Sequence, residues 1–503
     1  MSYKPGKVAI IGGGIAGLCA AVYARQCGYE AEVFEQHESA GGLATSWHRD
    51  GYTFETCLHW LLGSKPGGAL HSTWQEVLDI ERLTFIDPPE YVRLEDERGE
   101  QLSIYTDADR MEAELLKAAP EDAVHIRAFA AAVRRLSGLR MSEEFWPPSL
   151  RTILRNLPSL PLLRSLSKLT IEEYGKRFHH TLLKAFFGSD DISGMPALAL
   201  LLSLAWMSEH NAGYPIGGSR AVIRPIADNL RHIGGNLRLG TQVKRIIVHN
   251  GAAVGVETAN GASVEADWVI SAADGHATIY ELLGGKYIDE TTDRIYRTLD
   301  TFPSYLQVSL GLARNLSAHG GLVTRLLDKP LPLDPGTELK QASFRFFHFD
   351  PTLAPAGKTA VTCFLPTRNF EFWTKLRQFE PARYELEKHR VADSVIAILE
   401  KSVPDVRQSI DVVDVSTPAT VIRYTGNWKG SMQGWLMTPG TGFRPLRHTL
   451  PHLRRFLMVG HWVMPGGGLP AGLLSARAAI RSLCKQDHVP FAPRRSERRN
   501  EAA

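Results

Sequence analysis

The chain has 503 residues, of which 44% are hydrophobic and 22% charged, so it is long enough for more than one globular domain. Its 57 basic and 54 acidic residues leave a net charge of +3, which is too balanced for a general nucleic-acid-binding protein. The five cysteines, an odd number without Cys-x-x-Cys spacing, argue for reduced thiols and against a disulfide framework or a metal site. No run of about 20 apolar residues occurs, so we expect no membrane-spanning helix.

The first 35 residues have the pattern of a dinucleotide-binding unit. The β-branched run 7–11 predicts a buried parallel strand, the Ala-rich segment 18–28 a helix, and residues 31–35 a second strand. A glycine-rich turn in G-x-G-x-x-G spacing separates the first strand from the helix and includes Gly12, Gly14, Ile15, Ala16 and Gly17. Such a turn lets backbone N–H groups and a helix N-terminus approach a pyrophosphate. The carboxylate of Glu35 ends the second strand, where it can accept hydrogen bonds from a ribose.

A second glycine pair, Gly41-Gly42, follows Glu35 by about six residues and is continued by Leu43. Its position favours a second contact to the same ligand over a plain turn. The chain enters its first strand within a few residues, which leaves no room for a targeting peptide. We therefore expect a cytoplasmic protein, free or peripheral on a membrane.

Residues 91–94 and 101–105 predict a hairpin, and 109–139 a helical segment broken at Pro120. The segment 151–169 is Leu-rich and basic, and two interpretations of it stay open. It is either an element that lies on a membrane surface or a pair of short core helices with a solvated basic edge. Further helices are predicted at 171–187 and 197–208.

The second half of the chain returns to an α/β pattern. A turn at 213–219 precedes a predicted helix at 220–233, and strands are predicted at 236–239, 242–248 and 253–258, the last two joined by an Asn-Gly turn. Residues 267–273 predict a buried strand that returns to the nucleotide-binding sheet. Residues 300–420 alternate strands with a helix at 381–402 and resemble a separate sheet domain.

The last part of the chain contains a second strand-loop-helix unit. Residues 456–460 predict a buried strand, 465–472 a glycine-rich loop and 473–484 a helix, which together form another site for an anion or dipole. The arginine-rich end of the chain, 489–503, predicts a basic disordered tail.

These motifs resemble the phytoene desaturase-like flavoproteins, which include carotenoid desaturases, carotenoid isomerases and retinol saturases within the amine-oxidase-like superfamily. The resemblance extends over nearly the whole chain and implies FAD as the cofactor. It implies an α/β fold with a three-layer, glutathione-reductase-like Rossmann-type FAD-binding domain, a mixed-sheet substrate domain and a helical cap. We assign 1–90, 213–285 and 445–488 to the first, 91–150 and 286–444 to the second, and 151–212 to the cap.

The resemblance also implies roles for single residues. The first glycine motif and Glu35 would bind the ADP half of FAD, and Gly41, Gly42 and Leu43 would lie near the pyrophosphate and the flavin. Val243 would make a backbone contact to adenine, and Ala273 lies where the second strand returns. The final motif would face the flavin through Gly460, His461, Leu469, Ala471 and Gly472, the last three against the isoalloxazine. The family usually has Gly-Asp where this chain has Gly460-His461, which puts one contact to a ribityl or pyrophosphate oxygen in doubt.

Three side chains are candidates for catalysis. His59 is either an acid/base near the flavin ring or a packed, hydrogen-bonded histidine. Tyr424 and Trp428 would line a lipophilic tunnel, form the aromatic sandwich of an amine oxidase, or pack as core aromatics.

We therefore expect an FAD-dependent oxidoreductase that desaturates, saturates or isomerises carbon–carbon bonds of a lipophilic polyene or isoprenoid-like substrate by hydride transfer to or from flavin N5. The main alternative is a soluble amine or amino-acid oxidase that uses O₂, and the second is a non-catalytic flavin- or lipid-binding protein. The chain has no second complete G-x-G-x-x-G unit. We therefore predict no tightly held NAD(P)H, with a quinone, O₂ or a diffusible donor as the redox partner.

Overall fold

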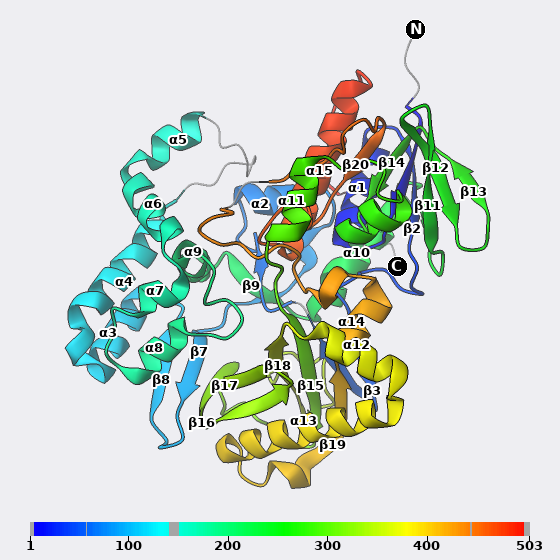
Figure 1. Cartoon of the computed structure of the whole chain (residues 1–503). Helices are drawn as coiled ribbons and strands as arrows, with labels where there is room; N and C mark the ends of the chain where they lie inside the picture. Colours follow the sequence, from blue (N-terminus) through cyan, green and yellow to red (C-terminus); the bar gives the residue numbers. More distant parts are fainter. Residues whose placement is uncertain (1–4, 57, 140–149, 443–444, 497–503) are drawn as a thin grey trace, which may run out of the picture.

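The computed structural model describes residues 5–56, 58–139, 150–442 and 445–496. Figure 1 shows an upper region with α1, α15, β14 and β20, a second sheet region with β15 to β19 below it, and a group of helices to one side. None of the helices in these described ranges has the length and hydrophobicity that crossing a bilayer requires. Of the five cysteines, Cys57 lies outside the described residues and the other four are buried and free.

The nucleotide-binding unit predicted from the sequence is the centre of a five-stranded parallel sheet. Its strands, in spatial order, are β10 (Asn236–Arg238), β2 (Glu30–Phe34), β1 (Lys7–Ile11), β14 (Trp268–Ser271) and β20 (Phe456–Met458). Strands from three distant parts of the chain therefore pair side by side. The predicted return of residues 267–273 to this sheet is confirmed, because β14 pairs with β1 from Val8 to Ile11.

Alternating side chains of β1 divide this region into three layers. Val8 and Ile10 pack against the helices α1 (Ile15–Gln26), α10 (Gly218–His232) and α15 (Gly468–Gln486). Ala9 and Ile11 face the opposite way, toward an antiparallel sheet of β11 (Val243–His249), β12 (Ala252–Thr258) and β13 (Ser263–Glu265). Both faces of the parallel sheet are therefore covered, which explains the continuous apolar run of β1.

A mixed seven-stranded sheet forms the second region. Its spatial order is β19 (Ile410–Ser416), β15 (Ser304–Leu312), β18 (Thr359–Thr367), β17 (Thr337–Phe346), β16 (Leu322–Asp334), β7 (Glu90–Glu95) and β8 (Gln101–Tyr105). Only the pair β16 and β7 is parallel among these strands. One face packs on α12 (Phe370–Phe379) and α13 (Pro381–Ser402), as Leu306, Val308 and Cys363 show. The other face points toward the nucleotide-binding region and the helices.

The helical region has one hydrophobic core. Its helices are α3 (Ala108–Ala118), α4 (Ala123–Ser137), α5 (Leu150–Asn156), α6 (Leu160–Lys168), α7 (Ile171–Gly175), α8 (Thr181–Phe187) and α9 (Ala197–Ser208). Leu115 of α3 and Phe129 of α4 share this core with Phe187 and Leu201 of the predicted cap. We had placed α3 and α4 in the substrate domain, and the boundaries of the three domains stay a prediction.

Short strands link the regions. The hairpin of β3 (Ser46–Arg49) and β4 (Tyr52–Glu55) follows the second glycine pair. Strand β9 (Ala212–Pro215) pairs with both β5 (Leu61–Leu62) and β6 (Phe85–Ile86), whereas we had predicted only a turn there. The remaining helices are α2 (Ala69–Trp74), α11 (Glu290–Thr298) and α14 (Pro418–Thr425).

Two other expectations change. Helices α1 and α15 begin three and five residues before the predicted starts, because the glycines before them leave the following residues free to enter the helix. Part of the predicted disordered tail is packed: Val489 and Phe491 lie against the core, and the Ser496 N–H donates to the Gln75 carbonyl. Residues 497–503 lie outside the described residues.

Candidate functional site

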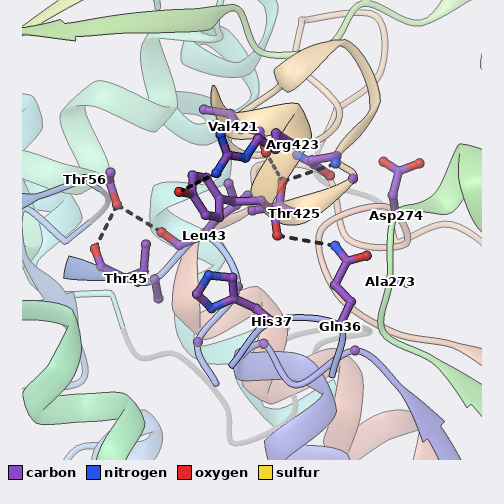
Figure 2. Close-up of a pocket in the computed structure, with 18 of the residues that line it drawn as sticks. Gln36, His37, Leu43, Thr45, Thr56, Ala273, Asp274, Val421, Arg423 and Thr425 are labelled. Atoms are coloured by element: carbon purple, nitrogen blue, oxygen red, sulfur yellow. Dashed lines mark hydrogen bonds between the residues drawn. The ribbon is translucent and has the colours of Figure 1, made fainter. Parts of the chain in front are cut away.

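A cavity of about 730 Å³ lies between the nucleotide-binding region and the seven-stranded sheet. This volume is in the range of small-molecule and cofactor sites. Figure 2 shows part of its wall, with Gln36 and His37 after β2, Ala273 and Asp274 after β14, and Arg423 from α14. The cavity therefore lies outside the carboxyl ends of parallel strands, where open α/β sheets bind their ligands.

The loop between β1 and α1 shows why its glycines are needed. Gly12 has φ +96°, which favours glycine. A Cβ on Gly17 would stand 1.9 Å from the Gly12 carbonyl oxygen, so Gly17 lets the helix pack against the end of the strand. A Cβ on Gly14 would meet only the Gly41 oxygen and the Gly42 Cα, at 3.7 and 3.8 Å. Packing within the protein therefore leaves room for a side chain at position 14. A ligand lying against this backbone would require a glycine there.

The first turn of α1 faces the cavity with its backbone donors uncapped. Its N-cap, Gly14, supplies no side-chain hydrogen bond, and both Ile15 and Ala16 line the cavity. The second glycine pair closes over this turn, since the Gly41 N–H donates to the Gly13 carbonyl at 3.0 Å. Free N–H groups and the positive end of the helix dipole make this an anion site.

The buried carboxylate of Glu35 lies at one end of the cavity. One of its oxygens accepts the Gly13 N–H at 2.6 Å, and the other accepts the His37 N–H at 2.8 Å. Both bonds fix the carboxylate without using all of its lone pairs. Glu35 is thus held in place to accept further hydrogen bonds from hydroxyl groups.

The glycine-rich loop before α15 and the first turns of α15 supply another part of the cavity wall. Gly466, Gly467 and Gly468 all have positive φ and lead into α15, whose N-cap also lacks a side-chain hydrogen bond. A Cβ on Gly472 would stand 2.6 Å from Ile15 Cγ2, so this glycine allows α15 to pack closely on α1. Two helix N-termini from opposite ends of the sequence therefore meet at one cavity.

His461 lines the cavity where the family has an aspartate. Burial lowers the pKa of His461 to about 4, so its imidazole is neutral at physiological pH. Its Nε2 lies 3.4 Å from Asn427 Oδ1. His461 therefore offers a neutral hydrogen-bonding group and brings no charge to this wall.

Asp274 is a buried carboxylate that we had not selected. It follows β14, lines the cavity and accepts the backbone N–H groups of Ala277 and Trp428, both at 2.8 Å. Burial raises the pKa of Asp274 to about 7, although these hydrogen bonds oppose the shift. Asp274 therefore joins the loop after β14 to the segment after α14. No local sequence pattern predicts this link.

Most of the predicted cofactor contacts do meet at this cavity. Those that line it are Gly12, Gly14, Ile15, Ala16, Glu35, Gly41, Gly42, Leu43, Val243, Ala273, Gly460, His461, Leu469 and Gly472. Gly17 does not line the cavity, because it packs α1 against the end of β1. Ala471 does not either, because it is buried against Met464 and Leu474.

The three catalytic candidates lie in three different places. Tyr424 lines the cavity beside Glu35, where its carbonyl accepts Gln36 Nε2 at 3.3 Å and its ring contacts His37. It therefore lies at the end where the ribose was predicted, and not at the flavin end. Trp428 is stacked on His276 at 4.8 Å between ring centroids. Tyr424 and Trp428 thus contact different histidines, and their role in a tunnel, a sandwich or the core stays a prediction.

His59 lies away from this cavity, against the seven-stranded sheet. Its ring contacts Phe364 of β18 at 5.5 Å, and its Nε2 is buried without a hydrogen-bond partner. Burial, with a smaller effect from the charge of Arg345, lowers the pKa of His59 well below its usual value. His59 is therefore neutral and is not the hydrogen-bonded packing residue that we had considered.

Helix α14 contributes a wall that sequence reasoning missed. Thr420, Val421 and Arg423 face the cavity although they lie almost 400 residues after Glu35. Neither composition nor spacing predicts that these residues belong to the site. The pairing of β19 with β15 brings α14 to the cavity.

The residues present fit FAD. The ligand-facing glycine at 14, the uncapped start of α1 and the fixed carboxylate of Glu35 suit an ADP moiety. The second uncapped helix, α15, suits a ring that gains negative charge on reduction. In the described part of the chain, no group of three or more His, Cys, Asp and Glu side chains is placed to hold a metal ion.

The comparisons with known proteins agree with this geometry. The family described as flavin containing amine oxidoreductase matches residues 15–481. The chain is 26% identical over 521 residues to 4,4'-diapophytoene desaturase (4,4'-diapolycopene-forming) of Methylomonas sp, covering 96% of each protein. It is 25% identical over 483 residues to the chloroplastic prolycopene isomerase of Arabidopsis thaliana, covering 92% of this chain and 80% of that protein.

Solved structures of similar fold cover nearly the whole chain. An oxidoreductase from Methanosarcina mazei superposes with a TM-score of 0.61 at 18% identity, covering 94% of this chain and 100% of that one. Putrescine oxidase bound to putrescine superposes with a TM-score of 0.58 at 14% identity, covering 96% and 99%. At these identities the likeness shows the fold alone.

Proposed function

The chain belongs to the family of flavin-containing amine oxidoreductases and is an FAD-dependent enzyme, and from this premise we propose that it acts on carbon–carbon bonds of a lipophilic polyene. The reaction class is desaturation, saturation or cis–trans isomerisation. The curated relatives named above, a desaturase and an isomerase, support this class. The direction of the reaction and the electron acceptor, a quinone or O₂, stay predictions.

FAD supplies the hydride chemistry when it is bound. We propose that the protein binds the ADP moiety through the start of α1, Gly41-Gly42 and Glu35. In this proposal the start of α15 stabilises negative charge on the ring, and the neutral His461 supplies a hydrogen bond without opposing that charge. The glycines at 12 and 17 act indirectly, by holding α1 against β1.

The observation that best supports an apolar substrate is the surface of α5 and α6. Ten large apolar side chains of the described residues are exposed. Five of them lie between positions 150 and 160: Leu150, Ile153, Leu154, Leu157 and Leu160. Leu150 is 72% exposed and Leu154 57% exposed. On α6, Leu166 is buried and Leu162 and Leu163 pack partly against the helical core, so one side of this helix faces the core. The exposed leucines lie outside that contact. We propose that this surface lies on a membrane and admits the substrate.

The charge around this surface suits an anionic bilayer. Arg155, Arg164 and Lys168 are exposed on the same two helices, where juxtamembrane cations gain from anionic lipid. Figure 1 shows α5 and α6 at the outer end of the helical group. A membrane-facing surface is thus available without any spanning helix.

The interior next to the helices is aromatic. On the sheet face that is opposite α13, Phe364 contacts Tyr305 at 5.8 Å between ring centroids. Tyr91 of β7 contacts Phe186 of α8 at 6.0 Å, so sheet and helices meet through aromatic rings. We propose that the substrate lies along this face.

The proposed function predicts that a polyene changes the redox state of the bound flavin. Purified FAD-loaded protein, kept anaerobic, is mixed with 4,4'-diapophytoene, phytoene or a cis-lycopene, and the visible flavin absorbance and product mass are followed. Desaturation bleaches the flavin and gives a product with two hydrogens fewer than the substrate. An unchanged mass with altered polyene absorbance shows isomerisation. No change with any polyene, together with peroxide formed from amines and O₂ in a parallel aerobic assay, would overturn the proposal in favour of an amine oxidase.

The proposed membrane surface predicts flotation with liposomes. The protein should float with vesicles of phosphatidylcholine and phosphatidylglycerol, and replacing Leu150, Leu154 and Leu157 by Ser should abolish most of this binding, because each buried leucine contributes about 1.5–3 kcal/mol. The matched control is Leu386→Ser on α13, where a leucine that is 68% exposed lies away from α5 and α6. Equal flotation of the triple variant and the control contradicts the assignment.

A further inference from the structure

Arg345 is a half-buried arginine on the aromatic face of the seven-stranded sheet. It lies on β17, paired with Thr362 of β18 and Leu322 of β16. Its Nε is buried without a hydrogen bond, and its side chain makes no hydrogen bond or ion pair with a described residue. The cost of an unpaired cation in a protein interior is high, so such a group indicates a missing partner.

Arg345 and its neighbours keep part of their surface exposed. His59, Tyr91 and Tyr305, like Arg345, have an intermediate exposed area. Burial lowers the pKa of Arg345 to about 10, and it therefore stays protonated at neutral pH. The carboxylate of Asp191 accepts the hydroxyl groups of Tyr305, at 3.2 Å, and of Ser189.

Other polar atoms near Arg345 also lack partners. On the same face, Thr362 Oγ1 and Gln307 Oε1 are buried without a hydrogen bond, and so is Nε2 of the neighbouring His59. These groups stand among aromatic rings, namely Phe364 and Tyr305. A purely hydrocarbon substrate would leave all of them unpaired, whereas a carboxylate end group accepts hydrogen bonds from donors such as Arg345, the Thr362 hydroxyl and His59 Nε2. The Gln307 oxygen is itself an acceptor and is not matched by a carboxylate.

We propose that Arg345 binds a carboxylate at one end of the substrate, while the apolar chain of the substrate lies along the aromatic face. An arginine fork matches a carboxylate with two parallel hydrogen bonds, and a neutral His59 is able to donate a further one. Arg345 is then a residue that determines specificity for an acidic polyene. This inference rests on the proposed function and makes it more specific.

The test compares two probes with the same polyene chain, the anionic retinoic acid and its neutral methyl ester. Their dissociation constants for the FAD-loaded full chain are measured by quenching of tryptophan fluorescence. We expect the acid to bind at least about 10-fold more tightly than the ester, because charge-assisted hydrogen bonds are the stronger kind. Arg345→Met should bring this ratio close to one, and Arg345→Lys should keep part of it.

Arg325 on the neighbouring strand β16 is the matched control, because it is buried but is already paired with Glu95 and Glu97. Arg325→Met should lower the Tm and leave the ratio of acid to ester unchanged. Arg345→Met should not lower the Tm, because it removes an unpaired charge. The FAD content of every variant is measured to show that it is folded.

Two results would overturn the inference. One is equal binding of acid and ester, or binding of neither, by the wild-type protein. The other is an unchanged ratio in Arg345→Met. If hydrocarbon polyenes still bleach the flavin in that case, the proposed function stands and only the carboxylate subsite is wrong. If no polyene affects the flavin, the proposed function fails as well.

Discussion

Glu55, at the end of β4, is held in the interior as an unusually weak acid. One of its oxygens accepts the Ser219 hydroxyl at 2.7 Å and the Ser219 N–H at 3.1 Å, while Oε1 has no partner. Burial raises the pKa of Glu55 from 4.5 to about 7, and the bonds from Ser219 reduce this shift. The protonated form of Glu55 is therefore favoured in the folded protein.

This shift predicts a stability that depends on pH. Because the folded pKa is raised, the folded state binds more protons than the unfolded state between about pH 4.5 and 7, and the free energy of unfolding falls as pH rises through this window. The loss attributable to Glu55 is on the order of 3 kcal/mol. Urea unfolding of wild-type protein and Glu55→Gln from pH 4.5 to 8 checks this. A difference between the two that does not vary with pH contradicts the prediction.

In the turn between β1 and α1, Gly17 serves the packing of the helix and we expect Gly14 to serve the binding of the ligand. Gly17→Ala places its Cβ against the Gly12 oxygen, and we expect it to lower the free energy of unfolding by at least about 2 kcal/mol. Gly14→Ala, at φ −71°, meets only ordinary contacts, so its stability should stay within about 0.5 kcal/mol of wild type while FAD affinity falls. Unfolding of the apoproteins and FAD titration measure both quantities.

The two variants serve as controls for each other, since they change neighbouring glycines by the same methyl group. A Gly14→Ala protein that binds FAD as tightly as wild type would show that the backbone at 14 does not touch the cofactor. A Gly17→Ala protein of normal stability would show that α1 is able to move away from β1.

At the scale of the whole molecule, the cavity joins segments that are distant in sequence. Its walls come from α1, α14 and α15, and a ligand that fills it links the two sheet regions. We predict that removing FAD lowers the Tm, because a ligand at 1,000 times its Kd stabilises the folded state by about 4 kcal/mol. Thermal unfolding of holo- and apoprotein measures the difference.

Glu35→Gln tests the origin of this stabilisation. It should reduce the gain in Tm from FAD, because it removes a charged acceptor from the cavity. Glu32→Gln is the control, since Glu32 lies on β2, three residues before Glu35, but pairs with Lys7 and Arg238. An equal gain in both variants would contradict a role for Glu35 in cofactor binding.

The nucleotide half of the site was predictable because its parts are local. Gly12, Gly14 and Glu35 lie within 24 residues, in one β-α-β unit whose handedness and geometry follow from backbone sterics. The positions of Tyr424 and Trp428 were not predictable, because they depend on where the seven-stranded sheet sets α14. Likewise, a leucine-rich segment does not show which leucines are buried, and the exposure of Leu154 emerged only from the packing of α5 and α6.

The sequence by itself therefore determined the strands of the nucleotide unit, the glycine turns and the cofactor class, since each depends on neighbours within one or two elements. Only the tertiary structure decided that α15 meets α1 at one cavity, that Ala471 turns into the core, and that Arg345 has no partner among the described residues. The physical reason is that burial and pairing are properties of contacts between distant segments. A charged residue is identical in sequence whether or not a counter-charge lies beside it in the fold.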